Sequence, residues 1–348
     1  MCADILQNII KYLHIRDQIN VCNLNKICHT QIKIFRLNDT RINDTVLTQN
    51  KFIFLKNLDI SDNPDVENIN HLVHLQELNC SNKCNVADEN ITNLINLKTL
   101  IACNNEKIKN VNHLINLQRL ECKGNCGISD INNCVNIKIL KAGGNQRIKD
   151  LNHLTKLKIL DCSGFYSKIS DEHIKSCTNL VSLNAYDNRY VKNIGHFTNL
   201  KHLNCGLNSP ISDTDIKNLK RLTVLRASNN DNIRDIDHLT NLKILDCCGD
   251  CGISNINLLN LLNLEELNVF TNDNITNINH LTKLKILNCS GYYCGISDKG
   301  IKNLLKLEKL ISRDNNKVKN ISNFPNLIEF NGQPIKQNKQ NKRVKQNK

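Results

Sequence analysis

Apolar residues recur along most of the chain with a fixed long period. The pattern L-x-x-L-x-(small or apolar)-x-x-N occurs in thirteen copies, at steps of 20, 22 or 23 residues. The copies begin at Leu55, Leu75, Leu97, Leu117, Ile137, Leu157, Leu180, Leu200, Leu222, Leu242, Leu264, Leu284 and Leu307, with a partial copy at Leu327. The first six positions predict a short strand whose apolar side chains point inward. Because one copy cannot bury its apolar face alone, the period predicts stacked turns around one continuous core.

The ninth position of the repeat is asparagine in nine of the thirteen copies. These residues are Asn63, Asn105, Asn125, Asn145, Asn188, Asn208, Asn230, Asn272 and Asn315. A side-chain amide carries both donors and an acceptor, so it can satisfy backbone groups of a neighbouring turn. We therefore predict that this asparagine turns the chain after each strand and ties adjacent turns together.

The sixth position alternates between cysteine and another small or apolar residue, as in Cys80, Ala102, Cys122 and Ala142. The repeating unit is therefore a duplicated pair of about 42 residues. Cysteine suits such an inward position because it behaves as a small hydrophobe. The 17 cysteines form an odd number in a long chain without a secretory signal, which favours reduced thiols over a disulfide framework.

Two periodic sets of residues raise the question of a metal site. The Cys-x-x-x-Cys pairs are Cys80/Cys84, Cys122/Cys126 and Cys247/Cys251, and the histidines are His71, His113, His153, His196, His238 and His280. A structural zinc site needs four converging ligands, whereas like copies lie two turns apart, about 10 Å. Inheritance from the duplicated unit explains the histidines. We therefore expect core packing for these cysteines, and neither a metal nor a cofactor.

These features together resemble the leucine-rich-repeat family, nearest to its short class of 20–22 residues per repeat. The resemblance covers residues 37–332. It implies an α/β solenoid with a curved parallel β-sheet on the concave side and mostly extended or 3₁₀ segments on the convex side, because so short a turn leaves little room for a full helix.

Residues 1–36 do not fit the repeat and show helical spacing, as in Ile5, Ile9 and Leu13. They resemble an F-box at Ile5, Leu6, Ile9, Tyr12, Leu13, Ile15, Asp17, Asn25, Lys26, Cys28 and His29. The usual Leu-Pro opening and the aromatic near the end of the motif are absent. The resemblance implies docking on the Skp-type linker of a cullin–RING ubiquitin ligase, with the docking face or its support at Ile5, Leu6, Ile9, Leu13 and Ile15. The alternative is a helical cap on the open end of the solenoid.

Charge and composition add little chemistry. The net charge is +13, of which residues 333–348 contribute six lysines and arginines without an acid, so we expect a basic disordered tail and no nucleic-acid partner. No run approaches the roughly 20 apolar residues that span a bilayer, and no catalytic motif appears. We expect an intracellular, cytoplasmic protein, with a nuclear location open, and no enzyme.

Alternation along each strand places the third, fifth and seventh positions of the repeat on the concave face. Binding surfaces favour clustered Tyr and Arg, and an exposed Phe on a strand face is hard to explain as core. We therefore predict a partner-binding surface at Tyr186, Arg226, Phe270, Arg313, Arg119, Lys141, His202 and Glu266.

The leading functional hypothesis is a substrate-receptor subunit of an SCF-type ubiquitin ligase, with a Skp-type linker and a protein target on the concave face as partners. The combination with abundant Asn, Ile and Lys resembles F-box/leucine-rich-repeat proteins of giant DNA viruses, which implies the host cytoplasm. The alternative is a free-standing interaction scaffold or inhibitor whose first helices only cap the solenoid.

Overall fold

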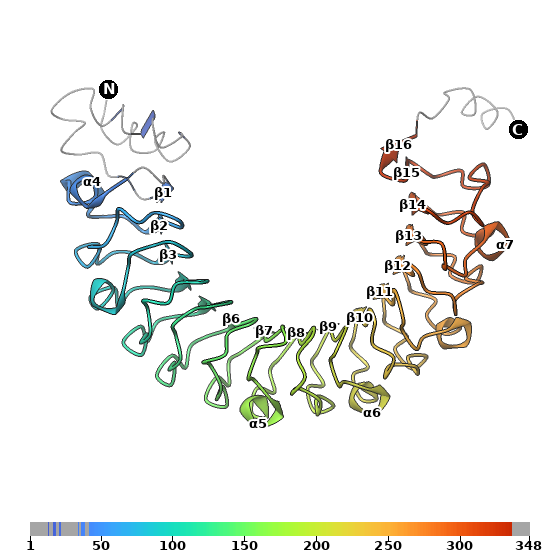
Figure 1. Ribbon diagram of the computed structural model, residues 1–348, viewed down its shortest axis with the longest axis horizontal. Coiled ribbons are helices and arrows are strands. Elements are labelled where there is room, and N and C mark those ends of the chain that lie inside the picture. Colours follow the sequence, from blue (N-terminus) through green and yellow to red (C-terminus); the bar gives the residue numbers. More distant parts are fainter. Residues whose placement is uncertain are drawn as a thin grey trace, which may run out of the picture. The chain divides into compact units, whose positions relative to one another are not determined.

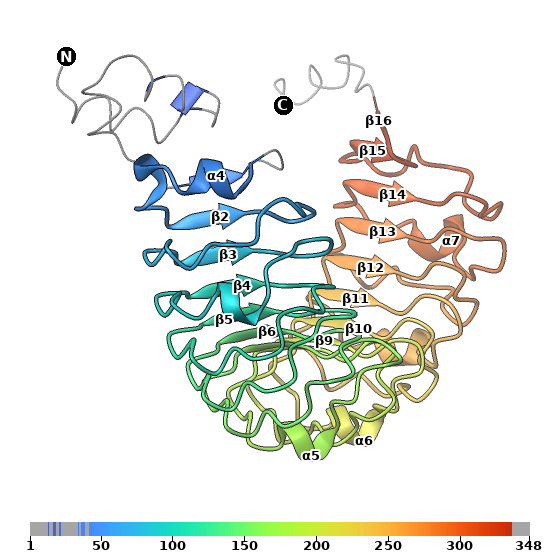
Figure 2. The ribbon, with the colours of Figure 1, turned by 60° about the vertical axis from the view of Figure 1, so that its left-hand side comes forward.

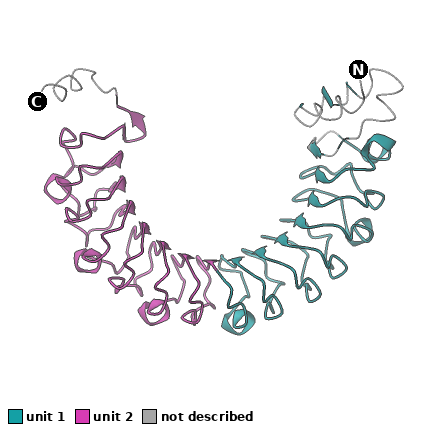
Figure 3. Ribbon diagram, turned by 180° about the vertical axis from the view of Figure 1, so that it is seen from behind, with its two compact units in different colours: residues 1–180 teal, residues 181–348 magenta. Residues whose placement is uncertain are grey.

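The computed structural model describes residues 13, 17–18, 21, 34, 36–38 and 42–335. It divides into two compact units, residues 1–180 and 181–348 (Figure 3), a boundary that falls inside the predicted repeat segment. In both units short parallel strands stack in sequence order (Figures 1 and 2), which confirms the leucine-rich-repeat solenoid.

The described residues of unit 1 form seven strands, each parallel to the next. They are β1 (Arg36–Asn38), β2 (Asn57–Asp59), β3 (Glu77–Asn79), β4 (Thr99–Ile101), β5 (Arg119–Glu121), β6 (Ile139–Lys141) and β7 (Ile159–Asp161). The register aligns the second leucine of every repeat, so that Leu100, Leu120 and Leu140 pair in series and lie fully buried. The flanking strand residues face the opposite side of the sheet, as alternation requires.

The part of unit 2 that the structure describes forms nine strands, and β8 to β15 keep the same parallel register. They are β8 (Ser182–Asn184), β9 (His202–Asn204), β10 (Val224–Arg226), β11 (Ile244–Asp246), β12 (Glu266–Asn268), β13 (Ile286–Asn288), β14 (Lys309–Ile311), β15 (Glu329–Phe330) and β16 (Gln333–Pro334). Only β15 and β16 pair antiparallel among the described strands of this unit.

Short helices lie on the side of each unit opposite the sheet, in agreement with the expectation of mostly 3₁₀ or extended segments there. They are α4 (Asp44–Leu47), α5 (Asp171–Ile174), α6 (Asp213–Ile216), α7 (Asp298–Ile301), η1 (Asn50–Phe52), η2 (Asp88–Asn90) and η3 (Asn255–Leu258). From Leu55 onward, helices occur only in the repeats that measure 22 or 23 residues. The two or three extra residues therefore form a single helical turn.

The asparagine prediction is confirmed for most repeats and wrong for two. Asn145 is fully buried; its Nδ2 donates to the carbonyls of Cys122 and Ile128 in the preceding turn, at 2.9 and 3.4 Å. Asn63, Asn105, Asn188, Asn230, Asn272 and Asn315 are buried as well. Asn125 and Asn208 are exposed. In their repeats the next residue, Cys126 or Ser209, occupies the buried place, because a small side chain fills the space between turns there.

Two serines stand where other repeats have cysteine. Ser209 aligns with Cys126 and Cys251, and Ser167 aligns with Cys294. The hydroxyls of Ser167 and Ser209 are buried without a hydrogen-bond partner. A buried hydroxyl without a partner destabilises a protein by about 1–3 kcal/mol, whereas a thiol tolerates such a place.

Replacing Ser209→Cys is therefore expected to raise the free energy of unfolding by about 1 kcal/mol, measured by urea denaturation. Ser228→Cys is the matched control in the same unit, because the Ser228 hydroxyl donates to Asp246 at 2.8 Å and gains nothing from the change. A gain at Ser228 equal to that at Ser209 would contradict the explanation.

Candidate protein-binding surface

An exposed tyrosine lies on the sheet face of unit 2, next to its first strand. Tyr186 follows β8 at the seventh repeat position and is 36% exposed. Its ring lies over Gly206 of the next turn, where an added Cβ would come within 3.0 Å of two ring carbons. Burial raises the pKa of the Tyr186 hydroxyl, so the phenol stays neutral and can donate a hydrogen bond at neutral pH. The glycine thus allows the ring to lie along the sheet with one edge open.

Phe270 occupies the same repeat position after β12 and is 44% exposed. Its carbonyl accepts hydrogen bonds from the Gly249 amide at 2.8 Å and from the Thr271 hydroxyl at 2.7 Å. Thr271 has a φ of 54°, a left-handed conformation that β-branched residues rarely adopt. The backbone that presents the Phe270 ring is therefore held in place on both sides.

Charged side chains surround the two aromatic residues. His202, Arg226 and Arg313 are exposed, whereas Glu266 is half-buried. Arg313 donates to the Asn331 carbonyl at 2.8 Å. Asp246 of β11, beside Arg226 in the register, accepts hydrogen bonds from Ser228 and Asn268 at 2.8 and 3.0 Å. The face therefore offers both hydrogen-bond donors and acceptors around its aromatic side chains.

These six predicted residues share one face but form no compact cluster. Tyr186 follows β8 and Phe270 follows β12, four strands apart. At about 4.8 Å per strand the separation is roughly 19 Å, about half the span of a standard protein–protein interface. The arrangement fits an extended partner surface rather than a small ligand.

The third repeat position also contributes apolar residues that the prediction missed. Val224, Ile244 and Ile286 lie half-buried on this face, where the prediction named only His202, Glu266 and other polar residues. The alternation rule that selected His202 applies equally to Val224 and Ile244. Their position in the repeat therefore indicated the sheet face, but as apolar residues they resemble core residues.

The two predicted residues in unit 1 belong to an ion-pair network. Glu121 pairs with Arg119 of its own strand and with Lys141 of β6, the latter at 3.0 Å, and Lys123 pairs with Asp161 at 2.6 Å. Burial raises the pKa of Glu121, but hydrogen bonds from Arg119 and Lys141 outweigh it, so the pKa is lowered overall. Arg119 and Lys141 therefore share one carboxylate within the chain, which cancels one of their two charges.

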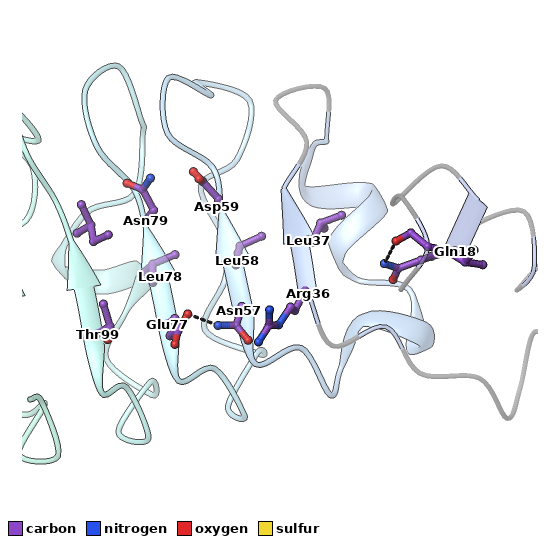
Figure 4. Close-up of a pocket in the computed structure, with 12 residues that line it drawn as sticks. Gln18, Arg36, Leu37, Asn57, Leu58, Asp59, Glu77, Leu78, Asn79 and Thr99 are labelled. Carbon is purple, nitrogen blue, oxygen red and sulfur yellow. Dashed lines mark hydrogen bonds between the residues drawn. The ribbon is translucent and has the colours of Figure 1, made fainter. Parts of the chain in front are cut away.

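A hollow of about 620 Å³ lies at the start of the sheet in unit 1 (Figure 4). Leu13 and Leu37 line it together with face residues of β2 to β4, and the Asn57 amide donates to Glu77 across it. Gln18 donates to the Leu13 carbonyl at 2.8 Å. Leu13 is the one predicted linker-binding residue that the structure describes, and it is half-buried. Ile5, Leu6, Ile9 and Ile15 lie outside the described residues.

The cysteines occupy the core positions predicted for them. Cys80, Cys122 and Cys247 are fully buried, and every cysteine from Cys80 to Cys294 is a free thiol. The hydrogen bond with Cys126 and burial together raise the pKa of Cys122 well above its usual value. The thiolate, which binds metals and attacks disulfides, is therefore disfavoured at Cys122.

The periodic histidines tie adjacent turns together. Nε2 of His113 lies 2.9 Å from the Ile91 carbonyl and Nε2 of His153 lies 3.0 Å from the Ile131 carbonyl. His71, His238 and His280 make the same contact. A carbonyl only accepts, so Nε2 carries the proton in each case. Their recurrence therefore has a structural reason, since each side chain satisfies a carbonyl of the preceding turn.

Within the described part of the chain, no helix is long and apolar enough to cross a membrane. The short helices of four residues or fewer follow from the repeat length.

Comparison with known proteins gives likeness in structure alone. No protein-family model and no curated protein matches the chain. A crystal structure of an internalin from Listeria monocytogenes matches with a TM-score of 0.58 and 26% identity, over 75% of this chain and 82% of that one. The functional domain of InlJ from the same organism, described with a cysteine ladder, matches with a TM-score of 0.50 and 20% identity, over 80% and 58%. TLR13 in complex with ssRNA13 matches with a TM-score of 0.57 and 19% identity, over 92% and 56%.

Proposed function

We propose that this protein is a receptor whose sheet face in unit 2 captures a partner protein, and whose residues 1–36 dock on the Skp-type linker of a cullin–RING ubiquitin ligase. The observation that carries the first part is the exposure of Tyr186 and Phe270 at a repeat position otherwise occupied by small or polar residues such as Ser163, Gly206 and Ser228. Parallel solenoids of this kind commonly use their sheet face as the binding surface.

Energetic reasons favour this face. Tyr and Phe bury large area on binding at little loss of conformational entropy, because each has only two side-chain torsions. Arg226 lies between the two aromatics along the sheet order, on β10, and arginine is among the side chains most enriched at binding hot spots. His202 on β9 lies between Tyr186 and Arg226, and Arg313 after β14 extends the same surface beyond Phe270. We propose Tyr186, Arg226 and Phe270 as its centre.

The second part rests on the F-box resemblance of residues 1–36. In this proposal, residues 37–332 are the target-binding solenoid and residues 333–348 a basic tail. The resemblance to proteins of giant DNA viruses would place the receptor in the host cytoplasm, where it would redirect a ligase.

A selection experiment tests the proposed face. Protein binders are selected from an unbiased displayed library on the full chain, then measured by biolayer interferometry against Phe270→Ala and Tyr186→Ala. Most binders are expected to lose affinity tenfold or more, because removal of a hot-spot aromatic commonly weakens binding by about 2 kcal/mol or more.

Leu262→Ala is the matched control, since Leu262 is an apolar residue of the same unit, 53% exposed, away from the sheet face. Binders that are unaffected by Phe270→Ala and Tyr186→Ala but lost with Leu262→Ala would move the binding surface to the edge of the repeats and overturn the proposal.

A further inference from the structure

A stripe of exposed apolar residues runs along one edge of unit 1. Val73, Ile95, Ile115 and Val135 are 40%, 53%, 55% and 44% exposed. Each occupies the same place in four consecutive turns, two residues before the first leucine or isoleucine of the repeat. Of the eight later full repeats, three carry Lys220, Leu262 and Leu305 at this place, and the other five carry a threonine, namely Thr155, Thr178, Thr198, Thr240 and Thr282. The repeat itself therefore does not require an apolar residue here.

The stripe is rigidly presented. Each residue lies in a tight turn closed by a backbone hydrogen bond, such as Leu97 to Leu94 at 3.0 Å around Ile95. Three of the four carbonyls of the stripe already accept hydrogen bonds from asparagine amides of the next turn, as Ile95 does from Asn116 at 3.0 Å. An added strand would need such backbone groups, so a partner must bind here through side chains.

Lysines accompany the stripe. The second repeat position carries Lys56, Lys98, Lys138 and Lys158, with Gln76 and Gln118 between them. Six turns begin at Leu55 to Leu157. In each of them, the four residues that end at the second repeat position include no Asp or Glu. Lys98 and Lys138 are exposed and form no ion pair with any described residue, and Lys138 contacts only the Gln118 amide, at 3.2 Å.

A hollow of about 300 Å³ extends the stripe toward the start of the repeats. Phe54 and His74 stack along it with ring centroids 5.2 Å apart, and Lys56, Gln76, Asn96 and Lys98 complete its lining. Stacked rings flanked by lysines accept an apolar side chain and a carboxylate together.

We propose that this edge of unit 1 docks an acidic amphipathic helix of a partner protein. Successive turns lie about 4.8 Å apart, so the four apolar residues span roughly 14 Å. A helix rises 1.5 Å per residue, so its positions i, i+3, i+7 and i+10 span about 15 Å on one face. An extended peptide presents same-face residues about 6.8 Å apart and misses this spacing.

The charges match the same geometry. Lys98 and Lys138 lie two turns apart, about 10 Å, which fits glutamates at i and i+7 of one helix flank. The surface lies on another side of the repeats from the sheet face, so the inference does not depend on the proposed function of Tyr186 and Phe270.

The test uses a fluorescein-labelled, Ala-rich helical peptide of about 18 residues. Leucines stand at i, i+3, i+7 and i+10, and glutamates stand at j, j+7 and j+14 on one flank of the leucine face. Fluorescence anisotropy with the full chain is expected to show saturable binding. Ile95→Thr with Ile115→Thr, which installs the residue of other repeats and so preserves the fold, is expected to weaken binding at least tenfold.

Charge reversal distinguishes this proposal from nonspecific hydrophobic binding. The double variant Lys98→Glu with Lys138→Glu is expected to bind the acidic peptide at least tenfold more weakly. The same variant is expected to bind a peptide with lysines in place of the glutamates. Thr198→Ile in unit 2 serves as the control for an isolated apolar residue, because Thr178 and Lys220 hold the same place in the neighbouring turns, and it should leave binding unchanged. Absence of saturable binding, or equal binding of acidic and basic peptides to the native chain, would overturn the proposal.

Discussion

Replacing Asn145→Ala is expected to lower the free energy of unfolding by about 2–4 kcal/mol. The Asn145 side chain donates to two carbonyls of the preceding turn and accepts from the amides of Arg147 and Ile148 at 2.7 and 3.2 Å. Alanine leaves these backbone groups buried without partners and opens a cavity beside them. Urea denaturation followed by far-ultraviolet circular dichroism measures the change.

Asn125→Ala is the matched control for this prediction. Asn125 holds the same ninth repeat position one turn earlier but is exposed, because Cys126 fills the buried place. Its replacement is expected to change the stability by less than about 0.5 kcal/mol, as surface substitutions usually do. Equal losses from the two variants would show that the buried asparagines do not hold the turns together.

Replacing Gly127→Ala is expected to destabilise unit 1 by about 1–3 kcal/mol, because overpacked sites shift the backbone. A Cβ on Gly127 would lie 2.4 Å from the Glu106 carbonyl oxygen and 2.7 Å from that of Ile108. The Gly127 amide also donates to the Asn105 carbonyl at 2.9 Å, so the chain cannot retreat without losing that bond. Thermal unfolding of the two proteins measures the effect.

The control for the glycine is Gly143→Ala in the same unit. Its added Cβ would lie 2.7 Å from the Ser163 hydroxyl and 3.2 Å from Asp161 Oδ1, both side-chain atoms, and no closer than 3.5 Å to a backbone atom. We expect a smaller shift in melting temperature for Gly143→Ala, because side chains move more easily than backbone. A larger shift than that of Gly127→Ala would disprove the close-approach explanation.

The fold could be predicted from the sequence because the same pattern occurs in many copies. Thirteen copies place leucine at the same strand positions, and a slip by one residue would expose every one of them. For this reason the stack of parallel strands, the inward cysteines such as Cys122 and the short helices were all predictable. The place of each helical turn, in the repeats of 22 or 23 residues, emerged only from the structure.

The prediction was wrong for Asn125 and Asn208, which shows what the repeat pattern alone cannot predict. Asn125 and Asn145 are identical in the repeat alignment, yet only Asn145 is buried. The difference comes from the following residue, since Cys126 is buried and small whereas Gln146 is exposed. Which of two neighbouring side chains enters the core depends on packing between turns, which one repeat taken alone does not contain.

The candidate site was predictable in part. Alternation identified Tyr186, Arg226 and Phe270 as members of the sheet face, and the structure places all three there. It could not reveal that Lys141 is held by Glu121, because that pairing joins adjacent strands. The apolar edge at Ile95 and Ile115 escaped notice for a related reason, since isolated β-branched residues look like core until their exposure is known.

The most direct test of the receptor proposal is a binding measurement with a purified Skp-type linker. The full chain and a chain of residues 37–348 are compared by pull-down and by isothermal titration, with circular dichroism as the control that the repeats stay folded. The account predicts binding by the full chain and its loss on removal of residues 1–36. Absence of binding by the full, folded chain would contradict the link to a ligase and leave a free-standing binding solenoid whose first residues only cap it.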